Sequence, residues 1–85
     1  MRNPEDCATM EDIRTQIDDL DEQIIDLLTK RVGYIDRAAE IKSSSGLPAN
    51  IPARVDQGVS KVRSRASQVG FDADLAEAIW RQMID

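Results

Sequence analysis

A long helical pattern near the N-terminus limits most strongly how this sequence can fold. From Met10 to Ile41 apolar residues recur at steps of three and four, which is the spacing of one face of an α-helix. Thr9 is a suitable N-cap for this helix, and Asp12 stands three residues later, in the capping-box position. A serine triplet followed by Gly46 ends the pattern. The sequence therefore predicts a first helix of about 34 residues, roughly 50 Å long.

A helix of this length cannot be covered by a chain of 85 residues. A compact monomer of that size would be only about 30 Å across. Gly33 costs about 1 kcal/mol relative to alanine in the helix interior and permits a bend there. The economical arrangement is a twofold homodimer in which the long helices run antiparallel and the remaining helices wrap around them.

The rest of the chain predicts two shorter helices. Pro52 suits the first position of the second helix, Gly70 suits the left-handed position after it, and Asp72 is a suitable N-cap for the third. The second helix has one apolar face: Val55, Val59, Val62, Ala66 and Val69. The third pattern is still running at Asp85, so we expect a truncated C-terminal helix. The predicted fold class is all-α, with three helices in a single domain over residues 1–85.

Composition excludes several classes of function. The chain has no histidine and one cysteine, Cys7, which excludes an internal disulfide, His-based acid–base chemistry and the usual zinc sites. A net charge of −5 argues against nucleic-acid binding. No apolar run approaches the length of a membrane span, and the acidic N-terminus does not resemble a signal peptide. We expect a cytoplasmic protein without a histidine- or cysteine-ligated metal.

Four cations occupy positions that simple helix stability does not favour. Arg14, Arg31 and Lys42 lie on or beside the apolar stripe of the first helix, and Arg54, in the first turn of the second helix, opposes the helix dipole. Each could extend along the apolar surface to reach solvent, or pair with a nearby acid. Four such cations in an acidic chain instead favour a small dicarboxylate ligand, because buried cations need partners.

Helix geometry then separates these cations within one chain. Arg31 and Lys42 lie within about 20° of each other around the helix and roughly 16 Å apart along it. Arg14 lies about 25 Å from Arg31 and about 42 Å from Lys42. One small ligand cannot reach Arg14 and Lys42 of the same straight helix. Antiparallel pairing brings Arg14 of one copy towards the other two cations of its partner, so the predicted site is shared between subunits.

These residues resemble the all-helical, AroQ-class chorismate mutase family. The family pattern for the first helix is matched by Ile13-Arg14-x-x-Ile17-x-x-Leu20-Asp21-x-x-Ile24-x-x-Leu27-Leu28-x-x-Arg31. The Ala38-Ala39-x-x-Lys42 ending, Arg54 and the Gly70-Phe71-Asp72 entry into the third helix also match. The resemblance implies an intertwined homodimer with two active sites, no cofactor, and the pericyclic rearrangement of chorismate to prephenate in aromatic amino-acid biosynthesis.

By the same resemblance, the partner's Arg14 and this chain's Arg31 would clamp the two substrate carboxylates. Lys42 would contact a carboxylate and the ether oxygen, and Arg54 would close the pocket near the ring hydroxyl. Lys42 and Arg31 are thus the expected catalytic residues. The other expected substrate-binding positions are Arg14, Arg54, Val55 and Ile51.

Two of these positions depart from the best-known mutases. Those enzymes have Glu where this chain has Val55, and commonly Asp where it has Ile51, so two polar contacts to substrate are absent. The catalytic glutamine of the family would align about six residues, or nearly two helical turns, beyond Asp85.

Two other functions remain open. The opening residues 3–7, Tyr34 and the stretch from Ile51 to Val55 are similar to isochorismate-pyruvate lyase, a branch of the same fold that forms salicylate and pyruvate. A non-enzymatic dimeric interaction module is the second alternative, with its cations paired or solvated. Lys61, Arg63 and Arg65 form a local basic face of the second helix that we expect to face solvent.

Overall fold

The protein is built from helices. The computed structural model describes residues 3–46 and 52–84. Within them a 3-10 turn, η1 (Pro4–Asp6), precedes three α-helices: α1 (Met10–Ser45), α2 (Pro52–Val69) and α3 (Ala73–Ile84). These elements form two units, one of η1 and α1 and the other of α2 and α3. The prediction of three helices, the first very long, is confirmed.

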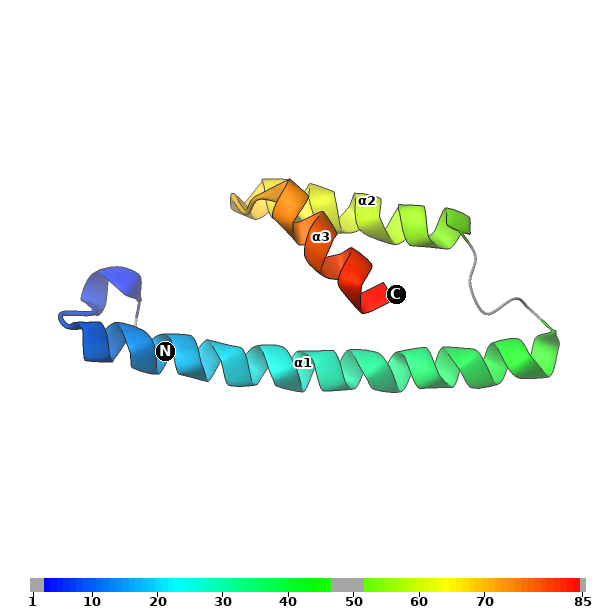
Figure 1. Ribbon diagram of the computed structural model, residues 1–85, viewed down its shortest axis with the longest axis horizontal. Coiled ribbons are helices and arrows are strands. Elements are labelled where there is room, and N and C mark those ends of the chain that lie inside the picture. The colour runs from blue at the N-terminus through cyan, green and yellow to red at the C-terminus, as the bar shows by residue number, and fades with distance from the viewer. Residues whose placement is uncertain (1–2, 47–51, 85) are drawn as a thin grey trace. The chain divides into compact units, whose positions relative to one another are not determined.

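The first unit is dominated by α1, which has 36 residues and is therefore about 54 Å long. At its start the Asp12 N–H donates to Thr9 Oγ1 at 3.1 Å, and the Ala8 N–H donates to Asp12 Oδ2 at 3.1 Å. The first of these bonds satisfies a backbone donor that the first helical turn leaves open, and the second ties the residue before the N-cap to the helix. The helix continues through Gly33 without interruption (Figure 1). It ends before Gly46, whose φ of 74° is the left-handed conformation that favours glycine.

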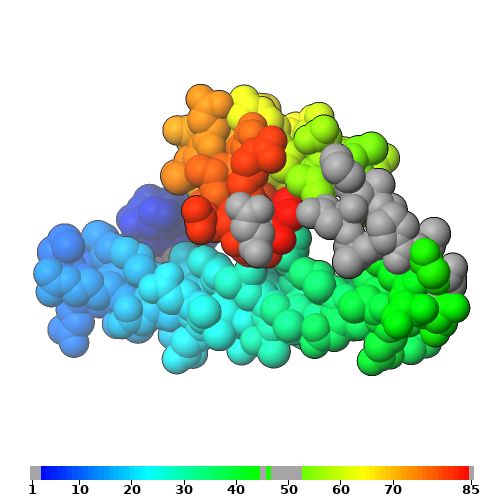
Figure 2. Space-filling view, turned by 45° about the vertical axis from the view of Figure 1, so that its right-hand side comes forward, coloured from blue at the N-terminus to red at the C-terminus, as the bar shows by residue number. Residues whose placement is uncertain are grey.

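The apolar stripe of α1 is largely exposed. The atoms of α1, coloured blue to green in Figure 2, form one long row. Between 38% and 63% of each of six large members is accessible: Ile13, Ile17, Leu20, Ile24, Leu27 and Ile35. A continuous apolar surface of this kind is typical of a face that is covered in an assembly. Within the described residues, no helix is long and apolar enough to cross a membrane.

The second unit is a helical hairpin whose core is small. Val59 and Ala66 of α2 and Ala76 of α3 are 4–6% exposed, and α2 and α3 pack against each other (Figure 1). Val55 and Val62 are half-buried on the same face of α2, while Val69, at its end, is exposed. Two buried alanines let the helix backbones approach closely, because they add little side-chain volume between them.

The turn between α2 and α3 is set by local sequence. Gly70 has a φ of 78°; its N–H donates to the Ser67 carbonyl, and the Phe71 N–H donates to the Ala66 carbonyl at 2.8 Å. This pair of bonds is the Schellman motif, in which a left-handed glycine ends a helix. Asp72 Oδ1 then accepts the N–H groups of residues 74 and 75 at 2.9 and 3.2 Å, so it caps α3 as predicted.

Candidate functional site

The three predicted site cations of the first unit all lie on α1. Arg14 is exposed near the start of the helix, whereas Arg31 and Lys42 are half-buried. Lys42 also lies in the last turn, where a positive charge favours the helix dipole. Because α1 is a single uninterrupted helix, eleven residues place Arg31 and Lys42 on one face, roughly 16 Å apart. These two cations can therefore face one small ligand together.

Arg14 is too far along the same helix to join them. Its distance from Arg31 is about 25 Å along α1, and its distance from Lys42 is about 42 Å. These separations exceed the reach of any arginine or lysine side chain. Within one copy of the chain, α1 therefore presents Arg31 and Lys42 as one group and Arg14 as a separate charge.

Arg54 lies in the first turn of α2, where its exposed side chain follows the helix surface. Its Nη1 donates to Gln57 Oε1 at 3.4 Å. A Cβ built on Gly58 would stand 3.8 Å from the same Nη1, so the guanidinium lies over that glycine. Arginine and residues three and four positions later are neighbours on a helix surface. The sequence analysis did not predict the Gln57 contact, although the spacing of three residues between Arg54 and Gln57 indicates it.

Two apolar residues, Val55 and Ile51, were predicted to line the site near Arg54, and the structure describes the first of them. Val55 is half-buried on the apolar face of α2. Ile51 lies outside the described residues. Val55 therefore offers a hydrocarbon side chain next to Arg54, and it cannot form the hydrogen bond that a carboxylate would provide.

Arg63 corrects an expectation from the sequence. It does not form a solvent-facing basic surface with Lys61 and Arg65, because its Nη1 reaches across to α3. There it contacts Asp74 Oδ1 and Glu77 Oε1, each at 2.9 Å, and donates to the Ala73 carbonyl at 3.3 Å. The turn at residues 70–72 brings these acids of α3 to Arg63, and that direction cannot be read from α2 alone.

The same network changes the titration of its members. The hydrogen bond to Asp74 raises the pKa of Arg63, and Glu77 adds to this effect. Arg81 Nε contacts Glu77 Oε2 at 2.7 Å, and this hydrogen bond, supported by Arg63, lowers the pKa of the Glu77 carboxyl. Arg63 is therefore occupied by carboxylates and is poorly suited to bind an anionic ligand.

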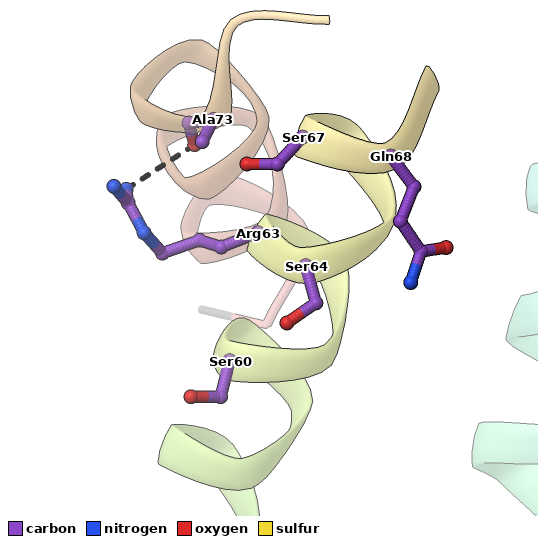
Figure 3. A pocket seen from close by; sticks show the side chains of 6 residues that line it. All are labelled: Ser60, Arg63, Ser64, Ser67, Gln68 and Ala73. Atoms are coloured by element: carbon purple, nitrogen blue, oxygen red, sulfur yellow. Dashed lines mark hydrogen bonds between the residues drawn. The ribbon is translucent and has the colours of Figure 1, made fainter. Parts of the chain in front are cut away.

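A polar depression beside this network does not contain the predicted site. Figure 3 shows it between α2 and the start of α3, with the Arg63–Ala73 hydrogen bond at one side. Its lining is Ser60, Arg63, Ser64, Ser67, Gln68 and Ala73. None of Arg14, Arg31, Lys42 or Arg54 is among these residues. Among residues 3–46 and 52–84, no group of three or more His, Cys, Asp or Glu side chains is placed to hold a metal ion.

This chain consists of a long N-terminal helix, which carries Arg14, Arg31 and Lys42, followed by a helical hairpin. These features place it in a class of all-helical proteins. The chain belongs to one family in this class, described as chorismate mutase type II, whose model matches residues 13–85. The resemblance seen in the first-helix pattern is thereby confirmed.

Three curated relatives show the range of this similarity. The chain is 35% identical over 85 residues to the isochorismate pyruvate lyase of Pseudomonas aeruginosa, covering 99% of this chain and 82% of the lyase. It is 34% identical over 77 residues to the T-protein of Enterobacter agglomerans, covering 91% of this chain but only 21% of the T-protein. It is 28% identical over 74 residues to the chorismate mutase of Methanocaldococcus jannaschii, covering 87% and 75% of the two chains. The chain thus spans most of two relatives and about a fifth of the third.

Proposed function

We propose that this protein is a chorismate mutase, which rearranges chorismate to prephenate without a cofactor. The observation that carries the proposal is the match of residues 13–85 to the chorismate mutase type II family. It is supported by Arg14, Arg31, Lys42 and Arg54, whose spacing resembles that of the family's cations. Chorismate carries two carboxylates, so a cationic site suits it. The reaction needs no nucleophile and no proton transfer, which agrees with a chain that has no histidine.

The active form in this proposal is a homodimer. The apolar stripe of α1 is about half exposed in one chain, and burial of such a surface is the main driving force for association. An antiparallel pair of α1 helices would cover this stripe and would bring the partner's Arg14 towards Arg31 and Lys42. Residues 1–85 would then act as one domain, completed by the second copy, with two sites per dimer.

Each residue of one site would have its own role in binding the substrate. Arg31 and the partner's Arg14 would each hold a carboxylate through two parallel N–H···O bonds. This clamp would keep the two reacting ends of chorismate close together and favour the reactive conformer, which converts binding energy into a lower entropic barrier. Arg54 would close the pocket next to the ring hydroxyl, with Val55 and Ile51 providing apolar contacts to the ring.

Lys42 would supply the main electrostatic stabilisation of the transition state. As the ether C–O bond breaks and the new C–C bond forms, negative charge accumulates on the ether oxygen. A fixed ammonium next to that oxygen stabilises the transition state more than the ground state, and only such a difference accelerates the reaction. Lys42 is half-buried, so its charge is less screened than that of a fully exposed lysine.

Isochorismate pyruvate lyase is the second candidate, and two observations favour it. The similarity to the Pseudomonas aeruginosa lyase extends over 85 residues of alignment, whereas the family model begins at residue 13. Val55 and Ile51 also stand where the best-known mutases have acidic residues that form polar contacts with the substrate. On this reading the same cations would bind isochorismate, and the products would be salicylate and pyruvate.

A paired assay separates these activities. The protein is offered chorismate and isochorismate in separate reactions, and the products are identified by NMR. Prephenate formed with the higher kcat/KM supports the mutase proposal, whereas salicylate and pyruvate with little prephenate assign the lyase activity. The Arg31→Met variant is the control, and we expect it to lose turnover and the ligand-induced rise in melting temperature. If neither substrate reacts or raises the melting temperature, the protein is an interaction module and the enzyme proposal fails.

A further inference from the structure

Arg54 is oriented by a contact with a neutral partner. Its guanidinium lies over Gly58 and donates to Gln57 Oε1 at 3.4 Å. A glutamine carbonyl fixes the direction of an arginine through a hydrogen bond but leaves its positive charge uncompensated. The contact is long and exposed, so it biases the orientation of Arg54 without locking it.

Three other arginines, Arg37, Arg63 and Arg81, are each paired with a carboxylate. Arg37, on α1, contacts Glu40 at the same spacing of three residues and at 2.7 Å. Arg63 and Arg81 contact Glu77 at 2.9 and 2.7 Å. By contrast, the first turn of α2 contains no acidic residue, and the ion pairs formed among the described residues do not include Arg54. The charge of Arg54 thus remains available to an anion.

We propose that Gln57 is a positioning residue for substrate binding, which orients Arg54 while preserving its full charge. This inference rests on the function proposed above, in which Arg54 closes the pocket over a dianionic substrate. Gln57 touches neither the substrate nor the reacting atoms. Its contribution is to reduce the conformational freedom that Arg54 would lose on binding.

The sharpest test replaces the neutral partner with a charged one. In Gln57→Glu the new carboxylate stands three residues after Arg54, as Glu40 stands after Arg37, and should form a similar ion pair. The ion pair would neutralise Arg54 and repel the substrate carboxylates, so we expect KM to rise about 10-fold with little change in kcat. The isosteric Gln57→Met variant removes only the hydrogen bond, and its KM should rise about 2-fold.

The same helix provides a matched control. Arg65 Nη1 donates to Gln68 Oε1 at 3.5 Å, so this pair repeats the spacing and chemistry of Arg54 and Gln57. Gln68→Glu changes the net charge of the chain by the same amount, and we expect it to leave KM and kcat unchanged. Circular dichroism of all variants verifies that each is folded before its kinetics are compared.

The outcomes separate this inference from the proposed function. A raised KM in both Gln57→Glu and Gln57→Met, together with wild-type kinetics in Gln68→Glu, supports the positioning role. Equal kinetics in the two variants, with an active wild-type protein, refutes the role of Gln57 and leaves the proposed function standing. A wild-type protein that turns over neither substrate refutes the proposed function and, with it, this inference.

Discussion

Replacing Ile24 with aspartate should dissociate the proposed dimer. Ile24 lies near the middle of the α1 stripe, and 51% of it is exposed in the single chain. Complete burial of an isoleucine side chain is worth about 1.5–3 kcal/mol, so covering the exposed half contributes about 1 kcal/mol per copy. Twofold symmetry doubles this to about 2 kcal/mol, or roughly 30-fold in the dimer Kd. Two carboxylates brought together in an apolar interface add a desolvation cost, so the Kd should rise at least about 100-fold.

Sedimentation equilibrium of the wild-type and variant proteins measures this change directly. The control is Ile25→Asp, which makes the same substitution one residue later and therefore 100° around the helix. Ile25 is 61% exposed and stands beside Asp21, Glu22 and Asp26, so an added carboxylate there should weaken dimerisation much less. If Ile24→Asp dimerises as tightly as the wild type, the stripe is not the interface and the reasoning is refuted.

Three further predictions concern the hairpin of α2 and α3. Val59→Ala removes two buried carbons and should lower the free energy of unfolding by about 1–2 kcal/mol in urea titrations; an unchanged midpoint would contradict the assigned core. Asp72→Ala removes the cap of α3 and should cost about 1 kcal/mol in the same assay, whereas an Asp72→Ser control that also lost stability would argue against a capping role. The lowered pKa of Glu77 means that its stabilising contribution is present above the usual glutamate pKa and is lost as pH falls through the lowered value. The acid-induced loss of thermal stability should therefore be smaller in Glu77→Gln than in the wild type, and identical pH profiles would show that the Glu77 ion pairs do not contribute.

The helix boundaries were predictable because their signals are local. Thr9, Gly70 and Asp72 were each assigned from the residue type that a helix end requires, and the structure confirms all three. Gly33 was expected to permit a bend, yet the hydrogen-bonded helix continues through it. One glycine costs a long helix little, because the turns on both sides keep their backbone bonds.

The contacts between helices were less predictable. The pairing of Arg63 with Asp74 and Glu77 depends on how the turn redirects the chain, and helical periodicity does not carry that information. The relative positions of the cations on α1 followed directly from residue spacing, because a continuous helix fixes both angle and rise. Whether they form one site depends on a second copy of the chain, which residue spacing alone does not reveal.

Subunit complementation tests the central claim, that each active site combines residues of two copies. Arg14→Ala and Arg31→Ala chains are each expected to be inactive, and they are mixed in equal amounts, unfolded and refolded together. Random pairing makes half of the dimers mixed, and each mixed dimer has one site with both arginines intact, so activity should return to about a quarter of the wild-type value. A mixture that stays inactive, while wild-type protein regains activity after the same treatment, would contradict a site shared between subunits.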